Sequence, residues 1–126
     1  MNEPFTILIA DRNPRIREFL QRELSEEGYF TKLANDGREV LRMLRSTPPD
    51  LLILDTDIPY LDGENILKRL QDDCPAIPVV VHAFSSAEIS DSSAKYPFAF
   101  IEKQGTNIDR LKSVVAQVLE EHYTKR

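Results

Sequence analysis

The sequence predicts a doubly wound α/β fold, in which five parallel strands form one sheet that helices cover on both faces. Short apolar segments of strand length recur along the chain and alternate with segments of helical periodicity. The strand-like segments are almost continuously apolar, as expected of parallel strands that are buried on both sides. Strands and helices that alternate in this way are joined by right-handed crossovers.

The predicted strands comprise residues 5–10, 30–34, 51–54, 79–81 and 98–101. The first helix is expected to begin near Pro14, which suits a first helical turn, and to end before Gly28, which suits a helix stop. Its apolar stripe consists of Ile16, Phe19, Leu20 and Leu24. The later stripes are Val40, Leu41 and Leu44, then Ile66, Leu67 and Leu70, and finally Leu111, Val114, Val115, Val118 and Leu119, which form the terminal helix.

The segment from Ser85 to Lys95 is rich in serine and has few apolar residues, so its helix is expected to be short, weakly anchored and mobile. No internal repeat or linker is visible. A chain of 126 residues is long enough for one core and too short for two. We therefore expect a single domain that covers residues 1–126.

The composition excludes several classes of function. A net charge of -5 and a pI near 5.0 argue against direct nucleic-acid binding, which needs a basic surface. The single cysteine, Cys74, cannot form an internal disulfide, and no cluster of Cys and His has the spacing of zinc ligands. No signal peptide and no apolar stretch near the roughly 20 residues of a membrane span is present. We expect a soluble, cytoplasmic protein that does not bind membranes.

Two aspartates follow predicted strands at positions where ligands usually bind. Asp11 ends the apolar run of residues 7–10, and Asp55 ends the run of residues 51–54. In a flavodoxin-like sheet of order 2-1-3-4-5, ligands lie outside the carboxyl ends of the strands, where the strand order reverses between strands one and three. Both carboxylates are therefore expected to face one crevice, and Lys103 ends the fifth strand at the same edge.

The segment Asp55-x-x-x-Pro59-x-x-Asp62-Gly63 and the aromatic and lysine spacing of residues 98–103 resemble the receiver domain of response regulators, the phosphoacceptor half of two-component signalling. The resemblance covers nearly all of the chain. It implies that Asp55 takes a phosphoryl group from the histidine of a sensor kinase or phosphotransfer protein.

Further site residues follow from the same resemblance. Lys103 would pair with the added phosphate, and Phe100 would occupy the aromatic switch position. Asp11, Asp55 and the backbone carbonyl of Asp57 would hold Mg²⁺, the usual ion of the family. An output protein would bind the face formed by the helix near residues 85–95, the fifth strand and the terminal helix, and a homodimer is possible.

The chain departs from the family pattern at residues that handle the metal and the switch. Arg12 replaces the second residue of the acidic pair, so a permanent cation stands where a metal-binding carboxylate is expected. Ala83 replaces the hydroxyl residue at the end of strand four and cannot donate a hydrogen bond to a phosphoryl group. Gln104 replaces the usual cis proline after Lys103, which predicts a trans bond and a reshaped lysine loop. We expect weak metal binding and impaired switching.

Some polar residues have competing interpretations. Arg12 is either a solvated cation or a partner that pairs with Asp11 or Asp55, lowers the pKa of that carboxyl and partly replaces the metal. His82 is expected to be a satisfied structural histidine in a core strand. Asp62 is expected to cap the next helix.

Two functional hypotheses remain open at this stage. The first is a phosphorylatable receiver, and the second is a pseudo-receiver that binds its partner without phosphorylation. An enzyme of the haloacid-dehalogenase type is rejected because Asp55-Thr56-Asp57 follows the third predicted strand rather than the first. A flavin binder is rejected because the turn after the first strand has no glycine-rich phosphate loop.

Overall fold

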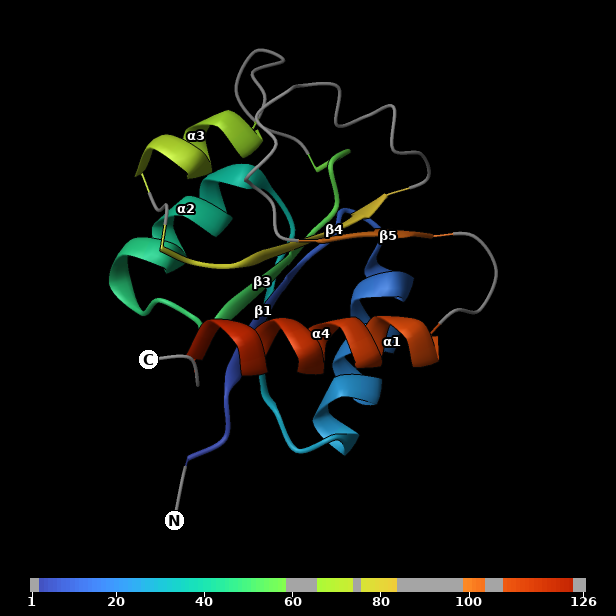
Figure 1. The fold of residues 1–126 in the computed structure, drawn as a ribbon. Helices are drawn as coiled ribbons and strands as arrows, with labels where there is room; N and C mark the ends of the chain where they lie inside the picture. The colour runs from blue at the N-terminus through green and yellow to red at the C-terminus, as the bar shows by residue number, and fades with distance from the viewer. Residues whose placement is uncertain (1–2, 59–65, 74–75, 84–98, 104–107, 124–126) are drawn as a thin grey trace.

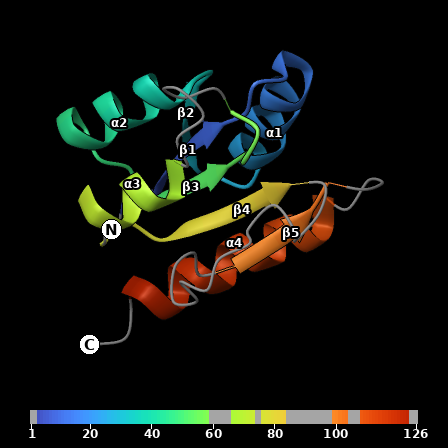
Figure 2. The ribbon, with the colours of Figure 1, turned by 90° about the horizontal axis from the view of Figure 1, so that it is seen from above.

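The computed structural model describes residues 3–58, 66–73, 76–83, 99–103 and 108–123. Within these residues, five parallel strands form one sheet of order β2-β1-β3-β4-β5 (Figure 2). The strands are β1 (Thr6–Ala10), β2 (Phe30–Ala34), β3 (Leu51–Leu54), β4 (Val79–Ala83) and β5 (Ala99–Glu102). The predicted fold class and strand order are confirmed.

The described helices cover both faces of the sheet. They are α1 (Pro14–Glu26), α2 (Gly37–Ser46), α3 (Ile66–Asp73) and α4 (Ile108–Tyr123). Helices α2 and α3 lie on one face, and α1 and α4 lie on the other (Figure 1). No helix in the described part of the chain is both long and apolar enough to cross a membrane.

Alternate residues of the strands pack into separate cores. In β1, Leu8 and Ala10 join the core beneath α2 and α3, whereas Ile7 and Ile9 join the core beneath α1 and α4. The central strands β1, β3 and β4 are buried over nearly all of their length. Burial on both faces explains why these segments are continuously apolar in sequence.

Helix α1 begins and ends at residues with the expected conformations. The side chain of Asn13 accepts a hydrogen bond from the amide of Arg15 at 2.9 Å, and Pro14 follows it in the first turn. Beyond the last turn, Gly28 has a φ of 98°, a left-handed conformation that glycine adopts without strain. The chain therefore turns directly from α1 into the edge strand β2.

Element bounds differ from the prediction mainly at the last two strands. Strand β4 continues for two residues beyond Val81, because His82 and Ala83 pair with Ile101 and Glu102 of β5. The polar His82 concealed this extension in the sequence. The weakly anchored helix predicted near residues 85–95 lies outside the described residues.

Candidate functional site

The candidate site lies at the carboxyl edge of the sheet, where three polar residues each continue a strand by one hydrogen bond. The amide of Asp11 donates to the carbonyl of Ala34 at 3.3 Å, and the amide of Asp55 donates to that of Ala10 at 2.9 Å. The amide of Lys103 donates to the carbonyl of Ala83 at 2.9 Å. The parallel sheet thus positions the backbone of all three residues at one edge.

The side chains of these residues meet in the interior. The Nζ of Lys103 lies 3.0 Å from Oδ2 of Asp11 and 3.1 Å from Oδ1 of Asp55. The lysine side chain is 4% exposed, and the aspartate side chains are 2% exposed. One buried ammonium therefore bridges two buried carboxylates, as the convergence of strand ends predicted.

Backbone amides hold both carboxylates in place. The amide of Asn13 donates to Oδ1 of Asp11 at 2.9 Å. The amide of Asp57 donates to Oδ1 of Asp55 at 3.0 Å, while that of Arg12 donates to Oδ2 of Asp55 at 3.2 Å. Each aspartate consequently has an orientation set by the turn that follows its strand.

Arg17 is a site residue that the sequence reasoning missed. From the first turn of α1, its Nη1 donates to the backbone carbonyl of Asp11 at 2.6 Å. This bond joins α1 to the turn that carries Asp11. No feature of the sequence distinguishes Arg17 from the other basic residues of that helix.

Burial dominates the electrostatics of Asp11. Desolvation raises the pKa of its carboxyl above the ordinary value of 3.8, and the charge of Asp55 raises it further. The amide of Asn13 and the ammonium of Lys103 act in the opposite direction without cancelling the rise. The ammonium of Lys103 and the amide of Asn13 therefore favour the ionised form of Asp11 against the effect of burial.

The side chain of Arg12 lies near Asp57. Its Nη2 lies 3.7 Å from Oδ2 of Asp57, and both side chains are solvent accessible, at 60% and 36%. Of the two interpretations of Arg12, pairing of its guanidinium with Asp11 or Asp55 is not what the structure has, because Lys103 lies between those carboxylates. The fall in pKa that such a pairing would cause is not found at Asp11, whose pKa is raised.

His82 is partly buried, and its Nδ1 does not match the satisfied histidine that the sequence suggested. Its Nδ1 has no hydrogen-bond partner among the described residues. Desolvation, together with the positive charge of Lys103, lowers the pKa of His82 to about 4. The imidazole is therefore neutral at physiological pH.

The predicted switch residues, Ala83 and Phe100, are in the neighbouring strands β4 and β5 and contribute to the same apolar cluster. Ala83 is 1% exposed, and Phe100 packs against the same apolar cluster. Ala83 ends β4 beside the lysine, and its methyl group offers no donor there. Pro59, Asp62 and Gln104 lie outside the described residues.

The donor set at this edge fits a magnesium ion poorly. Magnesium requires near-octahedral oxygen ligands, yet within the described ranges no three His, Cys, Asp or Glu side chains are arranged to hold a metal. Oδ2 of Asp11 is buried without a well-aligned hydrogen bond from those residues, but its neighbour is the ammonium of Lys103. The guanidinium of Arg12 adds a second fixed positive charge near Asp57.

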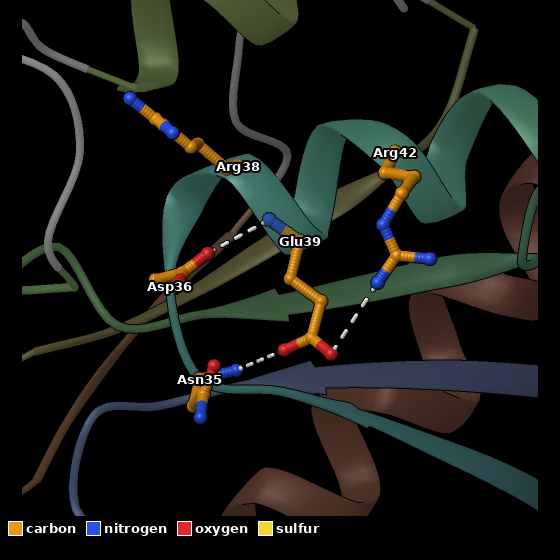
Figure 3. Close-up of a pocket in the computed structure, with 5 residues that line it drawn as sticks. All are labelled: Asn35, Asp36, Arg38, Glu39 and Arg42. Carbon is orange, nitrogen blue, oxygen red and sulfur yellow. Dashed lines mark hydrogen bonds and ion pairs between the residues drawn. The ribbon is translucent and has the colours of Figure 1, made fainter.

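A second hollow, of about 440 Å³, lies at the start of α2 and is lined by Asn35, Asp36, Arg38, Glu39 and Arg42 (Figure 3). Its polar groups are already engaged: Asp36 accepts from the amide of Glu39 at 2.8 Å, and Glu39 accepts from that of Asn35 at 2.9 Å. Arg42 lies 3.6 Å from Glu39. Asp36 thus caps α2, and Glu39 binds the residue before the cap, so these contacts stabilise the start of the helix.

A sheet of order 2-1-3-4-5 with two aspartates and a lysine buried at its carboxyl edge defines a receiver-type signalling domain. The family model described as the response regulator receiver domain matches residues 7–116. The chain belongs to this family.

Similar proteins agree with that assignment. The response regulator MprA of Mycolicibacterium vanbaalenii is 40% identical over 78 residues, which are 62% of this chain and 34% of that protein. The match thus spans about a third of the curated relative. Among solved structures, the response regulator TrrA from Thermotoga maritima, in complex with Mg²⁺-BeF, is 32% identical with a TM-score of 0.78 and covers 90% of this chain and 97% of its own.

A receiver domain of a signal transduction histidine kinase from Syntrophus aciditrophicus is 30% identical, has a TM-score of 0.82 and covers 97% of this chain and 95% of its own. Receiver domains are signalling domains and are generally not enzymes. They interact with histidine kinases or phosphotransfer proteins. They generally bind Mg²⁺ at the acidic pocket. The chain is therefore a receiver domain of two-component signalling.

Proposed function

We propose that Asp55 is the phosphoryl acceptor of this receiver domain and that Lys103 pairs with the added phosphate. The observation that carries the proposal is the buried ammonium of Lys103, which lies 3.1 Å from Asp55 and 3.0 Å from Asp11. A phosphoryl group on Asp55 would add negative charge beside this cation. A preorganised cation of this kind stabilises the charge that develops during phosphoryl transfer.

The two oxygens of Asp55 have different surroundings. Oδ1 faces Lys103 Nζ and the amide of Asp57 at 3.1 and 3.0 Å, whereas the amide of Arg12 approaches Oδ2 at 3.2 Å. We assign Oδ2 as the attacking atom because its hydrogen bond is the longer one. The phosphoryl donor is the histidine of a sensor kinase or a phosphotransfer protein, and any self-catalysed transfer and loss of the group uses this same site.

Metal binding and switching are weakened in this proposal. Arg12 places a cation near the positions where Asp11, Asp55 and the carbonyl of Asp57 would hold Mg²⁺, so the ion binds weakly. Ala83 cannot donate a hydrogen bond to a phosphoryl oxygen, and Phe100 consequently lacks the hydroxyl that would couple its position to phosphorylation.

The output of the domain is a protein contact. We assign it to the face that includes β5, α4 and the segment near residues 85–95, with a homodimer as a possible arrangement. The net charge of -5 favours a protein partner over direct binding of nucleic acid. Residues 1–126 act as one domain in this proposal, and the cytoplasm is its location.

The second candidate function is a pseudo-receiver, which binds its partner without phosphorylation. The specific observation in its favour is the pair of substitutions at Arg12 and Ala83, which remove a metal ligand and a hydrogen-bond donor from the site. In that case Lys103, Asp11 and Asp55 act as a buried structural ion cluster.

Incubation with acetyl phosphate and magnesium, followed by measurement of intact mass, separates the two functions. A receiver gains about 80 Da, the mass of one phosphoryl group, and the Asp55→Asn variant gains nothing. A wild-type protein of unchanged mass would favour the pseudo-receiver. Asp57→Asn is the matched control, because it removes a neighbouring carboxylate and leaves the acceptor in place.

A further inference from the structure

The guanidinium of Arg12 lies beside Asp57 at the carboxyl edge of the sheet and is only loosely bound there. Its Nη2 is 3.7 Å from Oδ2 of Asp57, whereas a charge-assisted hydrogen bond is about 2.7 to 2.9 Å long. The side chains of Arg12 and Asp57 are 60% and 36% exposed, so water screens their attraction. The guanidinium can therefore exchange this contact for a stronger one.

The backbone of Arg12 is much more firmly placed than its side chain. Its amide donates to Oδ2 of Asp55 at 3.2 Å, and the preceding residue is bound to Ala34 by the hydrogen bond that continues the sheet. A long, exposed side chain thus begins beside the oxygen assigned as the attacking atom. A phosphoryl group attached there would lie within the region that the guanidinium can reach.

The charges at the site require a second cation once phosphate is added. Among the described residues, Lys103 is the cation that contacts both buried carboxylates, and its ammonium is already shared between them. A phosphoryl group carries close to two negative charges at neutral pH. A guanidinium can bind two of its oxygens at once, which a lysine ammonium or the single carboxylate of Asp57 cannot match.

We propose that Arg12 binds the phosphoryl group on Asp55 directly and thereby allows Asp55 to be phosphorylated without a divalent metal. This inference rests on the proposed acceptor role of Asp55. In the step, Oδ2 of Asp55 donates an electron pair to phosphorus, and the bond from phosphorus to the donor breaks. With acetyl phosphate, that electron pair leaves with acetate, no net proton is transferred, and Arg12 moves from Asp57 to the phosphoryl oxygens.

The test measures the rate of the roughly 80 Da gain with acetyl phosphate in buffer that contains EDTA and in buffer that contains Mg²⁺. The wild type is expected to gain the group in both buffers at similar rates. Arg12→Gln should slow the reaction in EDTA by about a hundredfold, the usual effect of removing one preorganised donor. Arg12→Lys should retain only part of the rate, because lysine keeps the positive charge and loses the bidentate contact with two phosphoryl oxygens.

Arg15→Gln is the matched control, because Arg15 is an exposed arginine three residues away and the substitution makes the same change in net charge. It should react as the wild type does in both buffers. Calorimetric titration with Mg²⁺ provides a readout that is independent of phosphorylation, and Arg12→Asp should bind the ion more tightly than the wild type. Circular dichroism confirms that each variant is folded.

The outcomes separate this inference from the proposed function. A wild-type gain in Mg²⁺ but not in EDTA would overturn the metal-free role of Arg12 and leave Asp55 as the acceptor. A gain in EDTA that Arg12→Gln retains would also overturn it. No gain in either buffer would overturn both the inference and the acceptor role of Asp55.

Discussion

Lys103→Met removes the ammonium that bridges Asp11 and Asp55 while keeping a side chain of similar length. The two carboxylates then remain buried at the edge of the sheet without the cation that lies 3.0 and 3.1 Å from them. At an effective dielectric constant of about 20, opposite unit charges at this separation attract by about 5 kcal/mol. Desolvation of the ions offsets much of that gain.

The net loss of stability at neutral pH should be about 3 to 5 kcal/mol, the usual effect of removing one partner of a buried ion pair. Protonation of Asp11 limits this loss at acid pH, because burial already raises the pKa of that carboxyl above 3.8 and the loss of Lys103 raises it further. A carboxyl whose pKa is higher in the folded state contributes stability below its unfolded pKa and loses it as the pH rises through its folded pKa. The difference from the wild type should therefore widen from pH 4 towards pH 7.

Urea denaturation followed by far-UV circular dichroism measures this effect at pH 4.5 and pH 7. Lys112→Met is the matched control, because Lys112 also has two carboxylate partners, Glu23 at 2.9 Å and Glu27 at 3.5 Å, but lies at the surface between α1 and α4. The control should shift the midpoint much less. Adding Asp11→Asn to Lys103→Met should recover part of the lost stability, because it removes one of the repelling charges.

Equal midpoint shifts for the two lysine variants would refute the reasoning, since they would show that burial of the ion cluster adds nothing. A loss that is the same at pH 4.5 and pH 7 would also contradict it. In that case the lysine would act through packing of its methylene groups rather than through its charge.

Other residues give independent predictions. His82→Leu should flatten the pH dependence of stability. The pKa of the histidine is about 4 in the folded protein and 6.5 in the unfolded chain, so the wild type loses up to about 3 kcal/mol of stability as the pH falls from 6.5 towards 4. Urea midpoints across this pH range measure the loss. Arg17→Met should cost about 1 to 3 kcal/mol, because it removes the donor 2.6 Å from the carbonyl of Asp11, and amide chemical shifts around Asp11 should report the change. Tyr123→Phe should cost about 1 kcal/mol in thermal unfolding, because the tyrosine hydroxyl donates to the carbonyl of Asp50 at 2.5 Å.

The fold was predictable because burial of the sheet on both faces produces a simple pattern in the sequence. Strands such as residues 51–54 are uninterrupted apolar runs, and the parallel arrangement places their carboxyl ends at one edge. Asp11, Asp55 and Lys103 each follow such a run or end the last strand. Their convergence therefore follows from topology and needs no information about side-chain conformation.

The contacts of the long side chains were not predictable in the same way. Arg12 could reach several carboxylates from its position, and the rotamer that the protein adopts directs it towards Asp57. Arg17 is one of 16 lysine and arginine residues, and its bond to a backbone carbonyl depends on the exact approach of α1 to the turn. Nδ1 of His82 has no hydrogen-bond partner in the described ranges, and this depends equally on what packs around the ring, which spacing along a strand does not encode.

The amides of Asp11, Asp55 and Lys103 should be among the slower hydrogens to exchange with deuterium at this edge, because each donates to a carbonyl of the sheet. These bonds oppose displacement of the main chain away from the neighbouring strands. With Asp55 as the proposed acceptor, the sheet would hold these peptide groups in place while the side chains respond to the added charge. Phosphorylation would then change the charge at this edge of the sheet without moving the backbone beneath it.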